Sequence, residues 1–366
     1  MTALTTVVLD MVVLGVVIGL RLLVKEDRDM RPASAGRSLA TCPGWDDPRP
    51  LRCCQSRRHA RPEELTVRAP EDLYRLHGEA ADLGHPVLLH SFTGFLDAGS
   101  AGRLAAEHLL TTLDHRVLAT FDPDELIDYR ARRPRMTFVE NRFTDAASAE
   151  LVLYEVTDAE GARFLLLTGP EPDFQWRRFT AAVRGLVERL GVRLVVGMTA
   201  IPWAAPHTRP VELTAHASDP SLVADRVPWV GTIEVPGHIS AVLELRLGEA
   251  GHPAMGFAAH VPHYLAQIDY PQASVALLQA VARATGLALP SDALRLVAEK
   301  TDEQIRGQLA TSDYAAAIKA LEEQYDASAG ARAGIGSGAA VPSADEIGDQ
   351  VERFLAELGE GHEDRD

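Results

Sequence analysis

The chain has 366 residues, of which 46% are hydrophobic and 24% charged, a balance typical of a globular protein with a sizeable core. A net charge of −16 argues against nucleic-acid binding, because duplex binding needs a basic surface. Residues 1–70 carry 11 Lys and Arg against 8 Asp and Glu, so the remainder of the chain holds a net charge of −19.

All three cysteines, Cys42, Cys53 and Cys54, lie in the N-terminal part of the chain. The rest of the sequence therefore offers no disulfide framework, no cysteine nucleophile and no cysteine-ligated metal. This distribution predicts a cytoplasmic protein.

Residues 1–62 are expected to form a leader. An apolar run at 7–24 is interrupted by Asp10 and Arg21, and it lacks the basic region and cleavage site of a secretory signal. The following residues to position 62 are rich in Arg, Pro, Ala and Ser and resemble a disordered linker. We favour an incorrectly assigned start or a dispensable leader.

The alternative for residues 7–24 is a membrane anchor, for which the run is barely long enough. Lys25, Arg28 and Arg31 behind it would then hold the body on the cytoplasmic side.

The body is expected at residues 63–326. It begins with a short helix at 71–83 and a strand at 86–92 that is apolar enough for burial on both faces. Glycines then mark a turn before a helix at 100–113 and a strand at 115–121. This succession is typical of a parallel sheet with crossover helices.

Two short strands at 151–156 and 163–167 flank a turn and predict a hairpin. The remaining expected elements are a helix at 174–190 ended by Gly191, strands at 193–198, 231–235 and 254–259, and helices at 240–247, 271–285, 292–312 and 314–326.

The composition of residues 327–342 predicts a flexible linker. An amphipathic helix is expected at 343–358, opened by the capping-box pair Ser343 and Glu346. Since one helix cannot bury its own apolar stripe, it should dock on its own body or, alternatively, on a partner.

A glycine-rich turn places Gly94, Asp97 and Ser100 between a strand and a helix. Glycines admit a ligand to the backbone, and a helix N-terminus attracts anions. The spacing matches neither the dinucleotide nor the P-loop motif, and Asp97 or Ser100 can equally cap the helix.

An acidic and then arginine-rich segment follows at 121–134. Its arginines, Arg133 among them, could bind a phosphate or carboxylate, or they could pair with acids at a subunit contact.

His207, Thr208 and Arg209, in Pro-His-Thr-Arg-Pro, follow the strand at 193–198. Parallel sheets bind ligands where their strands end. A histidine can carry a proton near neutral pH and an arginine can clamp an anion, so this loop is the first site candidate; the alternative is a rigid solvated loop.

His260, His263 and Tyr264 follow the strand at 254–259. Two histidines are too few for a metal site, so hydrogen-bonded packing histidines are the favoured interpretation, and neither a metal nor a cofactor is predicted. The chain lacks the common hydrolase, metalloprotease and kinase motifs, which leaves enzymatic activity open.

Six segments together resemble the actinobacterial branch of the PAC2 family, which is named after a proteasome assembly chaperone. They are GFLDAGSAG, FDPDELIDYRARRP, GPEPDFQW, PHTRP, HVPHYL and PSADEIGDQVERFL, and the resemblance spans residues 71–358. It implies a three-layer α/β/α sandwich similar to the nucleoside phosphorylase fold, and homo-oligomers.

Two functions follow. The first is an interaction protein of the assembly-chaperone type, with proteasome subunits as candidate partners. The alternative is an enzyme or sensor that binds a small anionic metabolite, such as a nucleotide, in a phosphorylase-like cleft. It would use Arg209 and Arg133 as clamps and His207 as acid or base.

Overall fold

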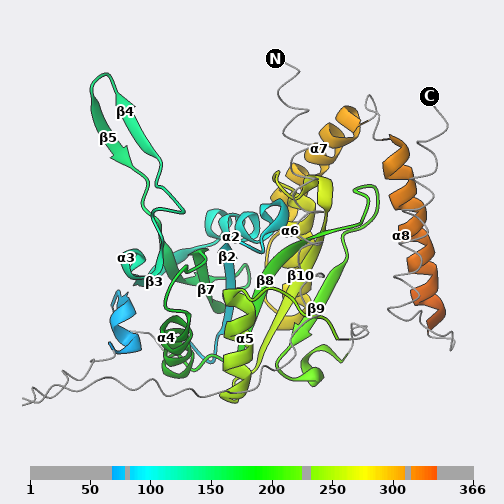
Figure 1. The fold of residues 1–366 in the computed structure, drawn as a ribbon. Coiled ribbons are helices and arrows are strands. Elements are labelled where there is room, and N and C mark those ends of the chain that lie inside the picture. Colours follow the sequence, from blue (N-terminus) through cyan, green and yellow to red (C-terminus); the bar gives the residue numbers. More distant parts are fainter. Residues whose placement is uncertain (1–67, 79–82, 225–231, 310–314, 336–366) are drawn as a thin grey trace, which may run out of the picture. The chain divides into compact units, whose positions relative to one another are not determined.

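The computed structural model describes residues 68–78, 83–224, 232–309 and 315–335, with side chains up to residue 327 (Figure 1). The chain divides into two units, Met1–Leu65 and Thr66–Asp366, and the described residues belong to the second. The expected leader at 1–62 and the expected helix at 343–358 lie outside the described residues.

Eight strands form one sheet in the order β1-β3-β6-β7-β2-β8-β10-β9. The pairings give β3, β7, β2, β8 and β10 one direction, and β1, β6 and β9 the opposite one. The strands are β1 (Tyr74–Leu76), β2 (Val87–Thr93), β3 (His115–Phe121), β6 (Leu151–Thr157), β7 (Arg163–Pro170), β8 (Leu194–Trp203), β9 (Leu213–Ala217) and β10 (Ala254–Pro262). The sheet is therefore mixed and mostly parallel, as predicted.

Helices cover both faces of this sheet (Figure 1). One core contains the buried faces of α2 (Ala101–Thr112), α6 (Pro271–Thr285) and α7 (Asp292–Leu309). The core on the other face contains α4 (Trp176–Arg189) and α5 (Ile239–Glu249). Because both faces are covered, β2 and β10 are buried along almost their whole lengths. The predicted α/β/α sandwich is confirmed.

Short elements complete the described fold. They are the 3-10 turns η1 (Pro70–Leu73), η2 (Ala98–Ser100), η3 (Pro220–Val223) and η4 (His263–Leu265), the short helix α3 (Pro123–Leu126), the separate hairpin β4 (Met136–Val139) and β5 (Arg142–Ala146), and the C-terminal helix α8 (Ala315–Ile335).

Two predicted elements are wrong. The helix expected at 71–83 is replaced by η1 and β1, because Leu73 is fully buried and β1 pairs antiparallel with β3. The strand expected at 231–235 is also wrong, since residues 232–237 are exposed and unpaired with any strand. The edge beside β10 is instead taken by β9, which was not predicted from the sequence.

Three further differences concern lengths and additions. β8 and β10 extend beyond their predicted ends, and α8 continues to Ile335, into the range where a linker was expected. The β4–β5 hairpin was not predicted at all.

Two imidazoles lie over two glycines in one row across the sheet. His90 of β2 is opposite Gly197, Gly197 is opposite Gly256, and Gly256 is opposite His216. A Cβ at Gly197 would lie 2.9 Å from His90 Cε1, and one at Gly256 only 2.4 Å from His216 Cε1. The two glycines therefore make room for the two rings.

Of the two histidines, His90 is the one whose burial is costly. It is 2% exposed, and its Nδ1 has no hydrogen-bond partner among the described residues. Burial, with smaller contributions from His238 and His216, lowers its pKa to about 3. The side chain is thus held neutral in the folded protein.

We expect the stability of this protein to fall on acidification in a His90-dependent way. The pKa is lower in the folded than in the unfolded state, so the unfolded chain binds the extra proton as the pH drops below about 6.5. The free energy of unfolding should then fall by about 1.4 kcal/mol per pH unit from this group alone. Urea unfolding at pH 7 and pH 5 measures the slope.

The variant His90→Asn cannot ionise and should lose this part of the slope. The matched control is His263→Asn, at an exposed histidine, which should keep the wild-type slope. Equal slopes for wild type and His90→Asn would contradict the assignment.

Candidate functional site

The candidate loop at 206–210 follows the carboxyl end of β8, next to β10, as the sequence predicted. His207 is 7% exposed, and Tyr264 from η4 holds it. The backbone N–H of His207 donates to the Tyr264 hydroxyl at 2.9 Å, and His207 Nδ1 lies 2.9 Å from the same oxygen. Two of the predicted site residues are therefore in direct contact.

The phenolic oxygen of Tyr264 thus serves two nitrogens of His207, the backbone nitrogen and Nδ1. Burial lowers the pKa of His207, so the neutral ring is favoured. Nε2 is buried and has no hydrogen-bond partner among the residues that the structure describes.

Thr208 and Arg209 are bound by helix α8. The Thr208 hydroxyl donates to Glu322. Arg209 donates from Nε and Nη2 to the two carboxylate oxygens of Asp326, at 2.8 and 2.7 Å, and its Nη1 lies 3.5 Å from Glu322. The hydrogen bond to Asp326 raises the pKa of Arg209 and lowers that of Asp326. The predicted anion clamp thus already holds two carboxylates of its own chain.

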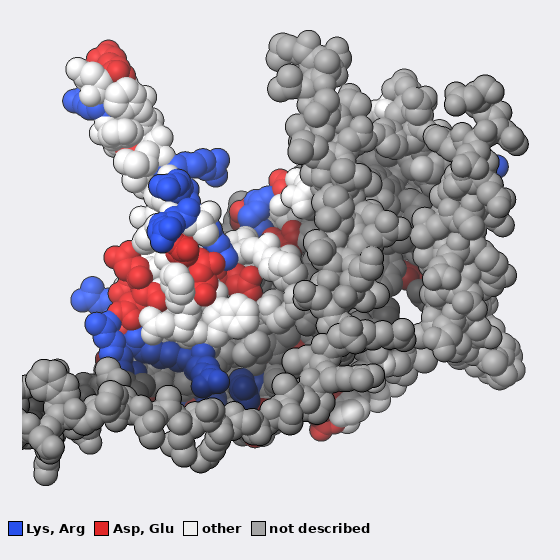
Figure 2. Space-filling view, viewed as in Figure 1, with Lys and Arg blue, Asp and Glu red and all other residues white. Residues whose placement is uncertain are grey.

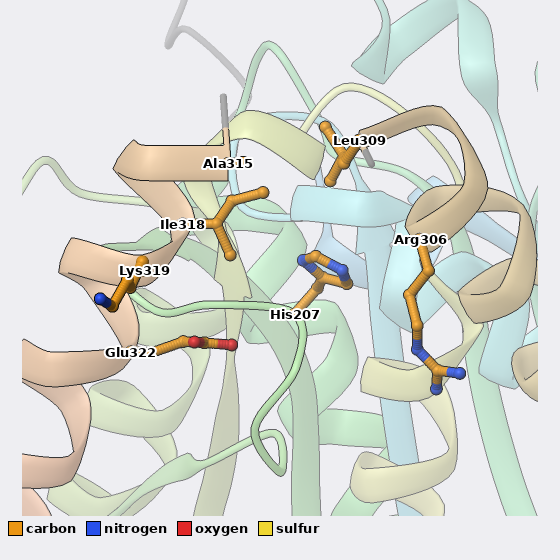
Figure 3. A pocket seen from close by; sticks show the side chains of 7 residues that line it. All are labelled: His207, Arg306, Leu309, Ala315, Ile318, Lys319 and Glu322. Carbon is orange, nitrogen blue, oxygen red and sulfur yellow. The ribbon is translucent and has the colours of Figure 1, made fainter. Parts of the chain in front are cut away.

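A shallow hollow of about 190 Å³ lies beside His207, between α7 and α8 (Figure 3). In Figure 3 Arg306 and Lys319 direct their charged ends away from His207. The residues that line the hollow are His207, Arg306, Leu309, Ala315, Ile318, Lys319 and Glu322. The hollow therefore has an apolar wall and lacks converging cations.

The glycine-rich turn is organised by Asp97. Its carboxylate accepts the backbone N–H of Gly102 at 2.7 Å and that of Arg103 at 3.4 Å, at the start of α2. Burial raises its pKa to about 6, although these two hydrogen bonds act in the opposite direction. Ser100 makes no such hydrogen bond. Of the two interpretations offered for this turn, Asp97 thus has the contacts of a helix cap.

Gly94 lies against a buried carboxylate. A Cβ at this position would lie 3.0 Å from Glu171 Oε2, and Glu171 also accepts the backbone N–H of Ile239 at the start of α5, at 2.8 Å. Arg132 donates to the Glu171 carbonyl at 2.7 Å and pairs with Asp173 at 2.8 Å. This cluster joins four segments of the chain, which contain Gly94, Arg132, Glu171 and Ile239.

Arg133, the predicted clamp, is exposed and makes no ion pair among the described residues. Its neighbour Arg132 makes the structural contacts instead.

The two histidines after β10 do not act together. His260 stacks on Trp203 with ring centroids 4.2 Å apart and lies 2.8 Å from the Thr214 hydroxyl, whereas the exposed His263 contacts the edge of Tyr264. No three His, Cys, Asp or Glu side chains in the described ranges are arranged to hold a metal ion.

Sequence reasoning missed the acidic partners of the loop, Glu322 and Asp326, and the Glu171–Arg132 cluster. The signals of Glu322 and Asp326 are weak, because acidic residues on a surface helix are common and their contacts with the loop span more than a hundred positions. The one available signal was the excess of acidic residues in the chain, which made a carboxylate partner for Arg209 plausible.

A mostly parallel sheet between two helical layers, with a polar loop at the end of a central strand, defines an α/β/α sandwich protein. The chain belongs to the PAC2 family, whose sequence model matches residues 91–309.

Solved structures agree with this assignment. A Mycobacterium tuberculosis protein of unknown function is 46% identical, with a TM-score of 0.70, covering 72% of this chain and 92% of its own. A Corynebacterium glutamicum protein of unknown function is 39% identical, with a TM-score of 0.66, covering 69% and 97%. A Mycobacterium tuberculosis proteasome-assembly chaperone homologue is 27% identical, with a TM-score of 0.59, covering 63% and 99%. None of the curated proteins matches.

No helix within the described residues is long and apolar enough to cross a membrane. Residues 7–24, considered above as an anchor, lie outside those ranges.

We expect Asp97→Ala to lower the free energy of unfolding by about 1–2 kcal/mol, because the first turn of α2 loses its acceptor. Asp97→Asn keeps an acceptor oxygen and should cost less. Urea unfolding at pH 7 measures both. Ser100→Ala is the control and should change stability by less than about 0.5 kcal/mol, since Ser100 makes no capping hydrogen bond. If Asp97→Ala cost no more than the control, Asp97 would not be the cap.

Proposed function

We propose that this chain is an interaction protein of the assembly-chaperone type, and that the β4–β5 hairpin is its binding arm. The observation that supports this most is the exposure of all nine strand residues in the hairpin. Met136, Phe138 and Phe143 are 53%, 57% and 66% exposed. Exposed apolar side chains gathered on one projecting element are typical of a protein–protein contact.

The arm has little to stabilise it alone. Phe138 and Phe143 contact each other across the hairpin, with ring centroids 4.9 Å apart. A two-stranded hairpin without a covering layer is marginally stable in water, so its apolar side chains gain from a partner surface. The Arg132 contacts to Glu171 and Asp173 fix its base to the sheet.

The charge of the arm indicates the chemistry of the partner. Arg130, Arg133, Arg135 and Arg142 are exposed, and none of the four forms an ion pair with a described residue. Figure 2 shows basic side chains gathered where the largely uncharged hairpin leaves the body. Arginine and aromatic residues are the types that dominate binding energy at interfaces. An acidic protein surface complements this arm.

A second copy of this chain meets that requirement, since its net charge is −16. We therefore expect a homo-oligomer in which the arm contacts a neighbouring copy. The likeness to a proteasome-assembly chaperone homologue, at 27% identity, supports proteasome subunits as further partners.

The alternative function, a binder of small anionic metabolites, depended on Arg209 and Arg133. Arg209 is engaged by Asp326 and Glu322, and the two cations that line the nearby hollow point away from it. We therefore favour the interaction protein.

The arm is tested by Phe138→Asp combined with Phe143→Asp. We expect a smaller particle by light scattering, with a melting temperature within about 2 °C of the wild type, because neither side chain belongs to the main cores. Burying two carboxylates in an apolar interface is costly, so the loss should exceed tenfold in affinity.

Leu296→Asp, on the exposed face of α7, is the matched control and should leave the particle unchanged. An unchanged particle for the double variant would count against the arm as the contact between copies. Pull-down from native cells with proteasome subunits as the readout tests the further partners separately.

A further inference from the structure

Helix α8 is attached to the body mainly by polar side chains. None of its described residues is buried, whereas eight residues of α6 are. Its polar contacts with the loop are those of Glu322 and Asp326 with Thr208 and Arg209, and a hydrogen bond of 3.3 Å from the Tyr325 hydroxyl to the Pro210 carbonyl. The attachment therefore depends on charge more than on apolar burial.

Such an attachment is specific but weak. The two-point pairing of Arg209 with Asp326 requires a carboxylate at one place and orientation. Exposed ion pairs contribute little to stability, because water competes for both partners, and they weaken as salt rises. Little free energy is thus needed to release α8 from the loop.

The contact between α8 and the body also leaves a space unfilled. The hollow of about 190 Å³ separates α8 from α7 beside the unpartnered Nε2 of His207. Ala315 and Ile318 supply the α8 side of its apolar wall, and Leu309 supplies the α7 side (Figure 3). A larger side chain in the place of Ala315 would bury more apolar surface there.

The contact residues of α8 form one face of the helix. Ala315, Ile318, Glu322 and Asp326 are spaced by three, four and four positions, the repeat that aligns side chains along a helix. This face defines what the loop recognises: two carboxylates one turn apart, preceded by apolar residues.

We propose that the loop Thr208–Pro210, together with the hollow beside His207, is a receptor for an acidic helix of a partner protein, and that α8 occupies it until the partner displaces it. The partner helix carries the same two carboxylates and a bulkier apolar residue where α8 has Ala315. This interaction is separate from that of the β4–β5 arm, and it does not depend on the arm.

The test uses a fluorescent peptide of residues 315–335 and the full chain. In the chain variant Glu322→Gln with Asp326→Asn, α8 loses its carboxylates and frees Arg209. We expect the peptide to bind this variant at least tenfold more tightly than it binds the wild type. Adding Arg209→Gln to the same variant should weaken binding at least tenfold, and so should 500 mM instead of 50 mM NaCl.

Peptide variants test the hollow and the carboxylates. Ala315→Leu in the peptide should strengthen binding several-fold, because it fills the apolar wall. Glu323→Gln is the control: it removes a charge whose contact is with Lys319 of the same helix, and it should leave binding unchanged.

Three results would overturn the proposal. One is equal binding of the peptide with and without Arg209→Gln; another is no binding to the freed variant. A third is an oligomer of the wild type that dissociates on Arg209→Gln, since the occupant would then be the α8 of a second copy and not a different protein. The arm variants distinguish this failure from that of the proposed function, because they leave residues 207–210 intact.

Discussion

Burial of the central strands on both faces is the constraint on which the rest of the molecule depends. β2 and β10 have no solvent-facing side, so they contain no Asp, Glu, Lys or Arg and only a few polar residues. Because these strands and β8 are parallel, their carboxyl ends open on one edge. The loop at 206–210, the Asp97 turn and the Glu171 cluster all lie along that edge, next to one another because the sheet puts them there.

The parts outside this packed body are held by different forces. The β4–β5 arm exposes aromatic and arginine side chains, and α8 has polar contacts in place of buried ones. Neither contributes to the two hydrophobic cores that stabilise the sandwich. Binding at either place can therefore change without loss of the fold, which suits a protein whose partners are other proteins.

The sequence predicted the elements whose burial pattern is local. The helix at 271–285 and the strand at 115–121 have the predicted bounds, because apolar periodicity reports directly on a buried face. The errors lie in elements whose structure depends on pairing with a strand distant in the sequence. β1 has only three residues and depends on β3 for its hydrogen bonds, and β9 depends on β10. The β4–β5 arm has no buried face, so its sequence lacks the pattern of buried apolar residues by which a strand is recognised.

The positions of the candidate residues were predicted better than the residues that they contact. His207 and Tyr264 lie together at strand ends, as expected for an open parallel sheet. The partner of Arg209, however, is 117 positions further along the chain, and no local pattern links the two. Such a contact is set by the packing of the C-terminal helices.

The row of His90, Gly197, Gly256 and His216 constrains how this sheet can change over time. Each ring occupies the volume that a neighbouring side chain would need, so a larger residue at either glycine is tolerated only after the facing histidine has become small. The intermediate with both large residues is overpacked, and the one with both small residues contains a cavity. Each pair should therefore be inherited as a unit, and related chains should differ at both members or at neither.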